Sequence, residues 1–160
     1  MGTVVDTTEE IWDRVINVNL KSVFLFSNYA IPAMAEREGG TIVNIASVNG
    51  FVALANEAAY DAAKGGVVIL SKAIAIDHHR QKIRVNRGCP SATDTPMLNR
   101  SINVALDPEK QRKSFIEYNA ALHLLIKQEE IAYAVFFLAS DESSAVTRAA
   151  PMVDGGWTAI

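Results

Sequence analysis

Two short runs rich in β-branched residues, TIVNIA at 41–46 and KIRVNRG at 82–88, are separated by a long segment with helical periodicity. Such runs favour β-strands, whereas apolar residues that recur every three or four positions favour helices. The periodicity predicts helices over 8–36, 57–79, 108–119 and 128–140, and a final short strand and turn over 149–156. Alternating helices and strands are typical of a parallel sheet with helices on its faces, so we expect an α/β fold.

The first predicted helix carries a polar residue on its apolar stripe. Thr7 and Glu10 have the spacing of a capping box, which begins a helix, and Trp12 is expected in the core. Asn19 lies four residues after Val15 on the same stripe. A buried amide without partners is costly, so two interpretations stay open. Asn19 is either a structural residue bonded to backbone or a polar group kept there for chemistry.

Composition limits the class of protein. A chain of 160 residues without a repeat, low-complexity tract or linker predicts a single domain over 1–160. The net charge of −3 argues against a nucleic-acid partner, and no apolar run approaches the roughly 20 residues of a membrane helix. Cys89 is the single cysteine and the N-terminus lacks a signal-peptide pattern, which predicts a cytoplasmic location. The adjacent His78 and His79 would diverge on a helix, so we expect no metal site.

Ser47 and the 90–97 loop fall where a parallel sheet binds ligands. Ser47 and the 90–97 loop each follow a predicted strand, and ligands bind beyond the carboxyl ends of such strands. Tyr60 and Lys64 are four residues apart and share one helix face. An ammonium beside a phenol lowers the phenol pKa from about 10, which suits proton exchange with a substrate oxygen that a serine can hold. A tight helix contact with an exposed Tyr–Lys pair would give the same spacing, and Gly65 and Gly66 favour close approach of a helix or a flat ligand.

Several segments, in order along nearly the whole chain, resemble the classical short-chain dehydrogenase/reductase family. DRVINVNLKSVF resembles the segment with the family's catalytic asparagine, here Asn19, and GGTIVNIASVNG the segment with its serine, here Ser47. YDAAK resembles its Tyr-x-x-x-Lys motif, here Tyr60 and Lys64. IRVNRGCPSATDTPM resembles the loop that packs on nicotinamide, and EEIAYAVFFLASDESS and VDGGW resemble its last helix and closing turn.

The resemblance implies a Rossmann-like three-layer sandwich and hydride transfer between NAD or NADP and an alcohol, ketone or aldehyde carbon. Tyr60 would exchange the proton, and Lys64 would lower the Tyr60 pKa and bind the nicotinamide ribose. Ser47 would fix the substrate oxygen, and Asn19 would hold a water of a proton relay. The implied cofactor contacts are Tyr60, Lys64, Pro90, Ser91, Thr93 and Thr95. The helices 8–36 and 57–79 resemble the pair that packs across a dimer axis, so a homodimer or tetramer is expected.

The glycine-rich part of the family's pattern is absent from residues 1–160. A dinucleotide fold has two halves, and the first supplies a glycine-rich turn that binds pyrophosphate at a helix N-terminus. Gly2 follows no predicted strand, so we expect the C-terminal portion of a doubly wound domain. Its cofactor binding would be weakened or lost, and the 41–46 strand would have an unpaired edge. The alternatives are a catalytically impaired chain that acts as a non-enzymatic interaction module, and a substrate-binding remnant.

Four residues depart from the family's pattern near the predicted strands. Ser91 stands where glycine is usual, and it would be strained at a positive φ. Arg87 stands where a small residue is usual, and Arg148 where glycine is usual. Pro151 would remove a ladder donor from the last strand unless it lies at that strand's start or edge.

Overall fold

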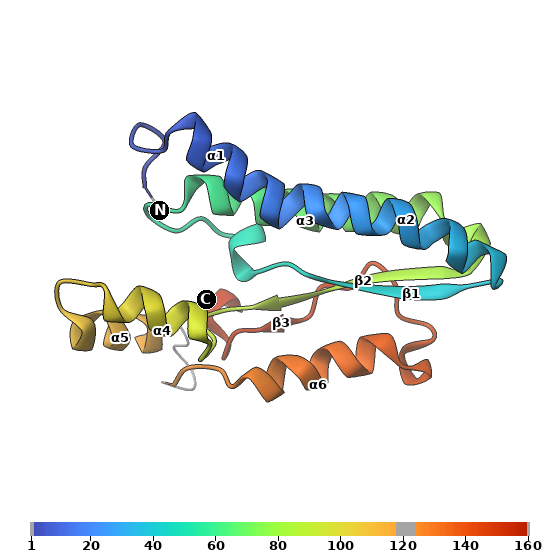
Figure 1. Cartoon of the computed structure of the whole chain (residues 1–160). Coiled ribbons are helices and arrows are strands. Elements are labelled where there is room, and N and C mark those ends of the chain that lie inside the picture. Colours follow the sequence, from blue (N-terminus) through green and yellow to red (C-terminus); the bar gives the residue numbers. More distant parts are fainter. Residues whose placement is uncertain (1, 118–123, 160) are drawn as a thin grey trace.

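Helices cover both faces of a small parallel sheet in a three-layer arrangement (Figure 1). The computed structural model describes residues 2–117 and 124–159. Strands β1 (Gly40–Ile45), β2 (Ile83–Pro90) and β3 (Met152–Val153) lie in the order β1-β2-β3, and both pairs are parallel. The α/β class and the parallel sheet predicted from the sequence are therefore confirmed.

The helices divide between the two faces and one end of the sheet. One face is covered by α2 (Ser22–Glu36) and α3 (Ala58–Asp77), with α1 (Glu9–Ile16) packed against α3, and the other face by α6 (Gln128–Ala139). Helices α4 (Pro96–Asn103) and α5 (Pro108–Glu117) lie beyond the carboxyl ends of the strands (Figure 1). The last two positions of the helix predicted over 108–119 lie outside the described residues.

The helix predicted over 8–36 changes its winding in the middle. Thr8 caps it rather than Thr7, because Thr8 Oγ1 accepts a hydrogen bond from the Ile11 N–H at 3.3 Å. Thr7 Oγ1 instead donates to the Thr3 carbonyl at 2.7 Å. Between α1 and α2, Asn17–Lys21 form a π-helical turn. Turns of this kind occur frequently at functional sites, and this one contains Asn19.

One element differs from the sequence-based expectation. Helix α4 begins inside the predicted 90–97 loop, where Thr95 Oγ1 accepts from the Leu98 N–H at 3.2 Å and Pro96 occupies the first turn. Within the segment predicted as a short strand and turn, 149–156, β3 is followed by a turn in which the Asp154 carboxylate accepts from the Gly156 N–H at 3.0 Å. Pro151 precedes this strand, and its carbonyl accepts from the Cys89 N–H at 3.1 Å, so its missing donor costs the ladder nothing.

Two clusters of buried apolar side chains hold α2 and α3 on one face of the sheet. The first contains Ile31, Ile74, Ala75, Ile83 and Val85, and the second contains Ala46, Val67, Val68 and Cys89. Ala46 directly precedes Ser47, and Val67 lies one turn after Lys64. The second cluster therefore packs the two segments that carry these polar residues against each other.

The outer edge of β1 carries no partner strand within the described ranges. Ile45, at the carboxyl end of β1, is 44% exposed. An apolar strand edge of this kind can accept a further strand. The edge predicted to be unpaired is thus open in the part of the chain that the structure describes.

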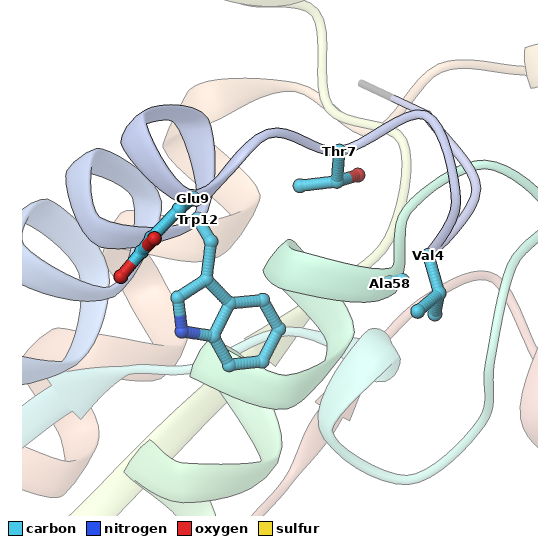
Figure 2. A pocket seen from close by; sticks show the side chains of 5 residues that line it. All are labelled: Val4, Thr7, Glu9, Trp12 and Ala58. Atoms are coloured by element: carbon cyan, nitrogen blue, oxygen red, sulfur yellow. The ribbon is translucent and has the colours of Figure 1, made fainter.

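Trp12 is partly exposed, contrary to the expectation that it lies in the core. Its side chain is 41% exposed and borders a shallow cavity of about 260 Å³ with Val4, Thr7, Glu9 and Ala58. Figure 2 shows the indole beside the first turn of α3, with Thr7 and Val4 at the rim. Within the described residues, no other helix or strand covers the face of α1 that is turned away from α3 (Figure 1).

The two glycines early in α3 have different surroundings. A Cβ at Gly66 would lie 2.6 Å from Leu20 Cδ2, which belongs to the π-helical turn. A Cβ at Gly65 would meet the Gly50 carbonyl at 4.0 Å, an ordinary contact. Gly66 therefore allows the close approach of a neighbouring helical turn, and that turn carries Asn19.

Backbone strain falls on Arg148 and not on Ser91. Arg148 has φ 62°, a left-handed conformation that glycine adopts most easily, whereas Ser91 is not among the residues with positive φ. Arg87 is 1% exposed, and its Nη2 donates to the Arg148 carbonyl at 2.6 Å. Its Nε and Nη1 have no hydrogen-bond partner in the described ranges. Burial lowers the pKa of Arg87 from its usual value.

Candidate active site

Ser47 lies immediately beyond the carboxyl end of β1, where the alternating fold places ligands. It has extended backbone and caps the 3₁₀ turn Val48–Gly50. Ser47 is 5% exposed, and its Oγ donates to Asn49 Oδ1 at 3.0 Å and accepts from the Asn49 N–H at 3.2 Å. The position of this hydroxyl is therefore set by the turn itself.

Tyr60 and Lys64 face the same rim from the first turns of α3. The Lys64 Nζ lies 5.5 Å from the centroid of the Tyr60 ring and donates to the Ile45 carbonyl at 2.9 Å. Lys64 is 9% exposed, and burial lowers the pKa of its ammonium from the usual value. The bond to Ile45 ties α3 to the end of β1, so the strand and the helix present Ser47, Tyr60 and Lys64 together.

The pKa of Tyr60 is raised, whereas the Tyr–Lys spacing alone predicts a lowered value. Burial is the main cause, because it disfavours the phenolate, and the charges of Glu57 and Asp61 raise the pKa further. A hydrogen bond with Ser47 acts in the opposite direction. The Lys64 ammonium is directed to the Ile45 carbonyl, and burial is the largest influence on the pKa of Tyr60.

Asn19 is bonded within its own helix. Its Nδ2 donates to the Val15 carbonyl at 3.0 Å, in the manner of a structural asparagine. The residue is half-buried, and its π-helical turn contacts α3. Asn19 is thus placed next to the helix that carries Lys64, and its part in a proton relay stays a prediction.

The loop predicted to bind nicotinamide borders the same rim. The Pro90 carbonyl lies 3.4 Å from Ser47 Oγ, and the Ser91 N–H donates to the Val153 carbonyl at 3.2 Å. Thr93 Oγ1 donates to the Ser91 carbonyl at 2.9 Å, and Thr95 caps α4. The loop is therefore fixed by its own polar contacts at the carboxyl ends of β1 and β2.

Sequence patterns missed a group of polar residues behind Ser47. Asn49 Nδ2 donates to Glu57 Oε2 at 3.0 Å and to Asp61 Oδ1 at 2.7 Å. Burial and the nearby Asp61 raise the pKa of Glu57. The one signal in the sequence was the pair of carboxylates flanking Tyr60, at positions 57 and 61.

The residues near this rim offer neither a reactive cysteine nor a set of metal ligands among the described residues. Burial raises the pKa of Cys89 to about 11, so its thiol stays protonated at neutral pH and is a poor nucleophile. Within residues 2–117 and 124–159, no group of His, Cys, Asp and Glu side chains is arranged to hold a metal ion. The helices in the same ranges are too short or too polar to cross a membrane.

Comparison with known proteins identifies relatives over almost the whole chain. Residues 1–158 match the family described as enoyl-(acyl carrier protein) reductase. The chain is 42% identical over 160 residues to 2-(S)-hydroxypropyl-CoM dehydrogenase 3 of Xanthobacter autotrophicus. It is 38% identical over 157 residues to dehydrogenase/reductase SDR family member 6 of Danio rerio.

A solved structure has a fold similar to that of this chain. The crystal structure of levodione reductase matches with a TM-score of 0.93 and 35% identity, and the match covers 99% of this chain and 62% of that one. The matches to the two curated relatives cover 99% and 98% of this chain. They cover only 62% and 64% of those relatives, so the chain spans about 62–64% of their length.

Proposed function

We propose that this chain, which belongs to the short-chain dehydrogenase/reductase family, forms the proton-transfer and substrate part of an NAD(P)-dependent oxidoreductase. Its reaction would interconvert an alcohol and a ketone or aldehyde. The observation that carries the proposal is the convergence of three side chains at the carboxyl end of β1. The Lys64 Nζ lies 5.5 Å from the Tyr60 ring centroid, and the Ser47 hydroxyl is close enough to oppose the rise in the pKa of Tyr60.

Tyr60 is the proton carrier in this proposal. During alcohol oxidation the phenolate oxygen of Tyr60 takes the hydroxyl proton as the hydride leaves the substrate carbon, and in reduction the phenol returns it. Burial disfavours the phenolate. In this proposal the positive charge of Lys64, 5.5 Å from the ring centroid, offsets part of that cost when Tyr60 ionises. Ser47 holds the substrate oxygen beside the phenol.

The residues at the rim fit a nicotinamide nucleotide. Lys64 donates one of its three ammonium protons to the Ile45 carbonyl, which leaves donors for ribose hydroxyls. Thr95 Oγ1 accepts from Leu98, so its own proton suits a carboxamide oxygen, whereas Thr93 Oγ1 donates to Ser91 and keeps lone pairs for a carboxamide nitrogen. When bound, the nicotinamide accepts or returns the hydride.

Cofactor binding by the purified chain tests this function. Titration with NADH and NADPH is expected to change the fluorescence of the reduced nicotinamide and to saturate at or below millimolar concentration with one of them. Lys64→Met should weaken this binding about tenfold, because a charge-assisted hydrogen bond is lost. The matched control is Lys72→Met on the exposed side of the same helix, which should bind like the unmodified chain. If neither cofactor binds at millimolar concentration, the chain is not an independent dehydrogenase.

Exposed aromatic residues favour a second function, that of a module that binds another copy of the chain. Phe26 and Tyr29 of α2 are each 77% exposed, and they lie three residues apart on one face. Ile69 of α3 is 63% exposed. We propose that α2 and α3 pack against a second copy in a homodimer or tetramer.

Sedimentation velocity tests this assembly. The unmodified chain should sediment as a dimer or tetramer, and Phe26→Asp should shift it towards monomer because a charge would then be buried in the interface. Phe136→Asp on α6, also highly exposed at 72%, is the control and should leave the assembly unchanged. A monodisperse monomer of the unmodified chain would rule the assembly out.

A further inference from the structure

A buried chain of hydrogen bonds connects Ser47 to two carboxylates that the proposed reaction does not use. Ser47 Oγ donates to Asn49 Oδ1 at 3.0 Å, and Asn49 is itself 8% exposed. Asn49 Nδ2 donates to Glu57 Oε2 at 3.0 Å and to Asp61 Oδ1 at 2.7 Å. The second oxygen of Asp61 accepts from the Leu54 N–H at 3.1 Å. Three segments, the turn after β1, the loop before α3 and the first turn of α3, are thereby joined.

The two carboxylates determine which way the Asn49 amide points. The amide nitrogen carries two protons, and each is donated to a carboxylate oxygen. The opposite orientation would place the amide oxygen against both carboxylates, where every pair of atoms repels. The side chain of Asn49 therefore presents its oxygen to Ser47, and the Asn49 backbone N–H donates to the same hydroxyl at 3.2 Å.

The Ser47 hydroxyl has one proton and several acceptors within reach. The Asn49 oxygen lies at 3.0 Å, whereas the Pro90 carbonyl lies at 3.4 Å, near the limit of a hydrogen bond. The Tyr60 phenolate is a further acceptor for this hydroxyl, because a hydrogen bond with Ser47 opposes the rise in the pKa of Tyr60. Asn49 and Tyr60 thus compete for a single proton.

We propose that Asn49 is a positioning residue for Ser47: anchored by Glu57 and Asp61, its carboxamide oxygen holds the Ser47 proton and keeps it from the Tyr60 oxygen. With that proton held by Asn49, the Tyr60 phenolate stays available for the single hydroxyl proton of an alcohol. This last consequence rests on the proposed oxidoreductase function, whereas the arrangement of the proton does not.

The ionisation of Tyr60 in the cofactor-free chain reports on this competition. Tyrosines labelled with ¹³C at Cζ are titrated by NMR over the pH range in which circular dichroism shows an intact fold, and Tyr60→Phe assigns the resonance. Asn49→Leu frees the Ser47 proton for the phenolate, so the Tyr60 midpoint should fall by about one pH unit, a tenfold change in acidity. In a Ser47→Ala background there is no proton to free, and Asn49→Leu should then shift the midpoint by less than about a third as much.

The test compares the shift of the Tyr60 midpoint that Asn49→Leu causes when Ser47 is present with the shift it causes in the Ser47→Ala background. Effects of Asn49→Leu that act only through Glu57, Asp61 or Lys64 occur in both backgrounds, so they cancel in this difference. Equal shifts with and without Ser47, or no shift in either, would overturn the proposal. If Asn49→Leu does not fold, Asp61→Leu serves in its place, because leucine is of similar size and removes one of the two acceptors that fix the Asn49 amide. The experiment needs neither cofactor nor turnover, so a failed cofactor titration leaves its result meaningful.

Discussion

Tyr60→Phe is expected to lower turnover at least about 100-fold, because it removes the group that exchanges a proton with the substrate oxygen. The dissociation constant of the cofactor should change by no more than about twofold, since the aromatic ring stays in place and one hydroxyl contact is lost. Turnover is followed by reduced-nicotinamide absorbance with a panel of small alcohols and ketones, and binding by the fluorescence titration described above. The effect should appear in the rate constant for turnover and not in the affinity.

The chain offers a matched control for this substitution. Tyr133 lies on α6, on the opposite face of the sheet from α3, and is 73% exposed, so Tyr133→Phe removes a hydroxyl far from the rim. Tyr133→Phe should leave turnover unchanged. Unchanged turnover in Tyr60→Phe would refute the role assigned to Tyr60, and equal losses in both variants would show that the effect is not specific to the site.

The same substitution at two arginines of β2 is expected to change stability in opposite directions. Arg84→Met should lower the free energy of unfolding by about 3 kcal/mol, because it removes a guanidinium that donates several hydrogen bonds to the end of α6 and the segment after it. Arg84 donates to four acceptors, which are Leu138 O at 3.1 Å, Ser140 O at 3.1 Å, Ser143 Oγ at 3.1 Å and Val146 O at 3.0 Å. Arg87→Met should raise the free energy of unfolding by about 1 kcal/mol.

The reason for the gain at Arg87 is its poor hydrogen bonding. The guanidinium is buried, yet within the described residues it donates only from Nη2, to the Arg148 carbonyl. An apolar side chain of similar length removes the cost of burying that charge and still fills the space. Urea denaturation followed by circular dichroism at neutral pH measures both variants. A loss at Arg87 as large as that at Arg84 would show that the Arg87 guanidinium has found partners in solution.

The parts of the fold that were predictable from the sequence are those that local chemistry determines. β1 and β2 are short runs of β-branched residues, and α3 and α6 show a clear apolar period, so each was found within a few positions. Helix α4 was missed, although Thr95 and Pro96 form a cap followed by a first-turn proline. The cap and the proline lie within the segment predicted as a loop, 90–97.

Other features depend on how distant segments meet, and no local pattern carries them. The π-helical turn around Asn19 inserts into a regular helical period, and its contact with Gly66 appears only once α3 is packed against it. Asn49 meets Glu57 and Asp61 because the chain between 50 and 57 folds back on the start of α3. The raised pKa of Tyr60 likewise follows from burial, which the Tyr–Lys spacing cannot report.

The central claim is that the rim formed by Ser47, Tyr60, Lys64 and the loop after β2 receives a nicotinamide cofactor. Two-dimensional ¹⁵N–¹H NMR of the chain, recorded with increasing NADH and then NADPH, tests it residue by residue. With one of the cofactors, the backbone amides of Ala46, Ser47, Lys64, Thr93 and Thr95 should shift in a saturable manner, and those of α6 should not. Unchanged spectra with both cofactors at millimolar concentration, or shifts confined to residues away from this rim, would contradict the claim.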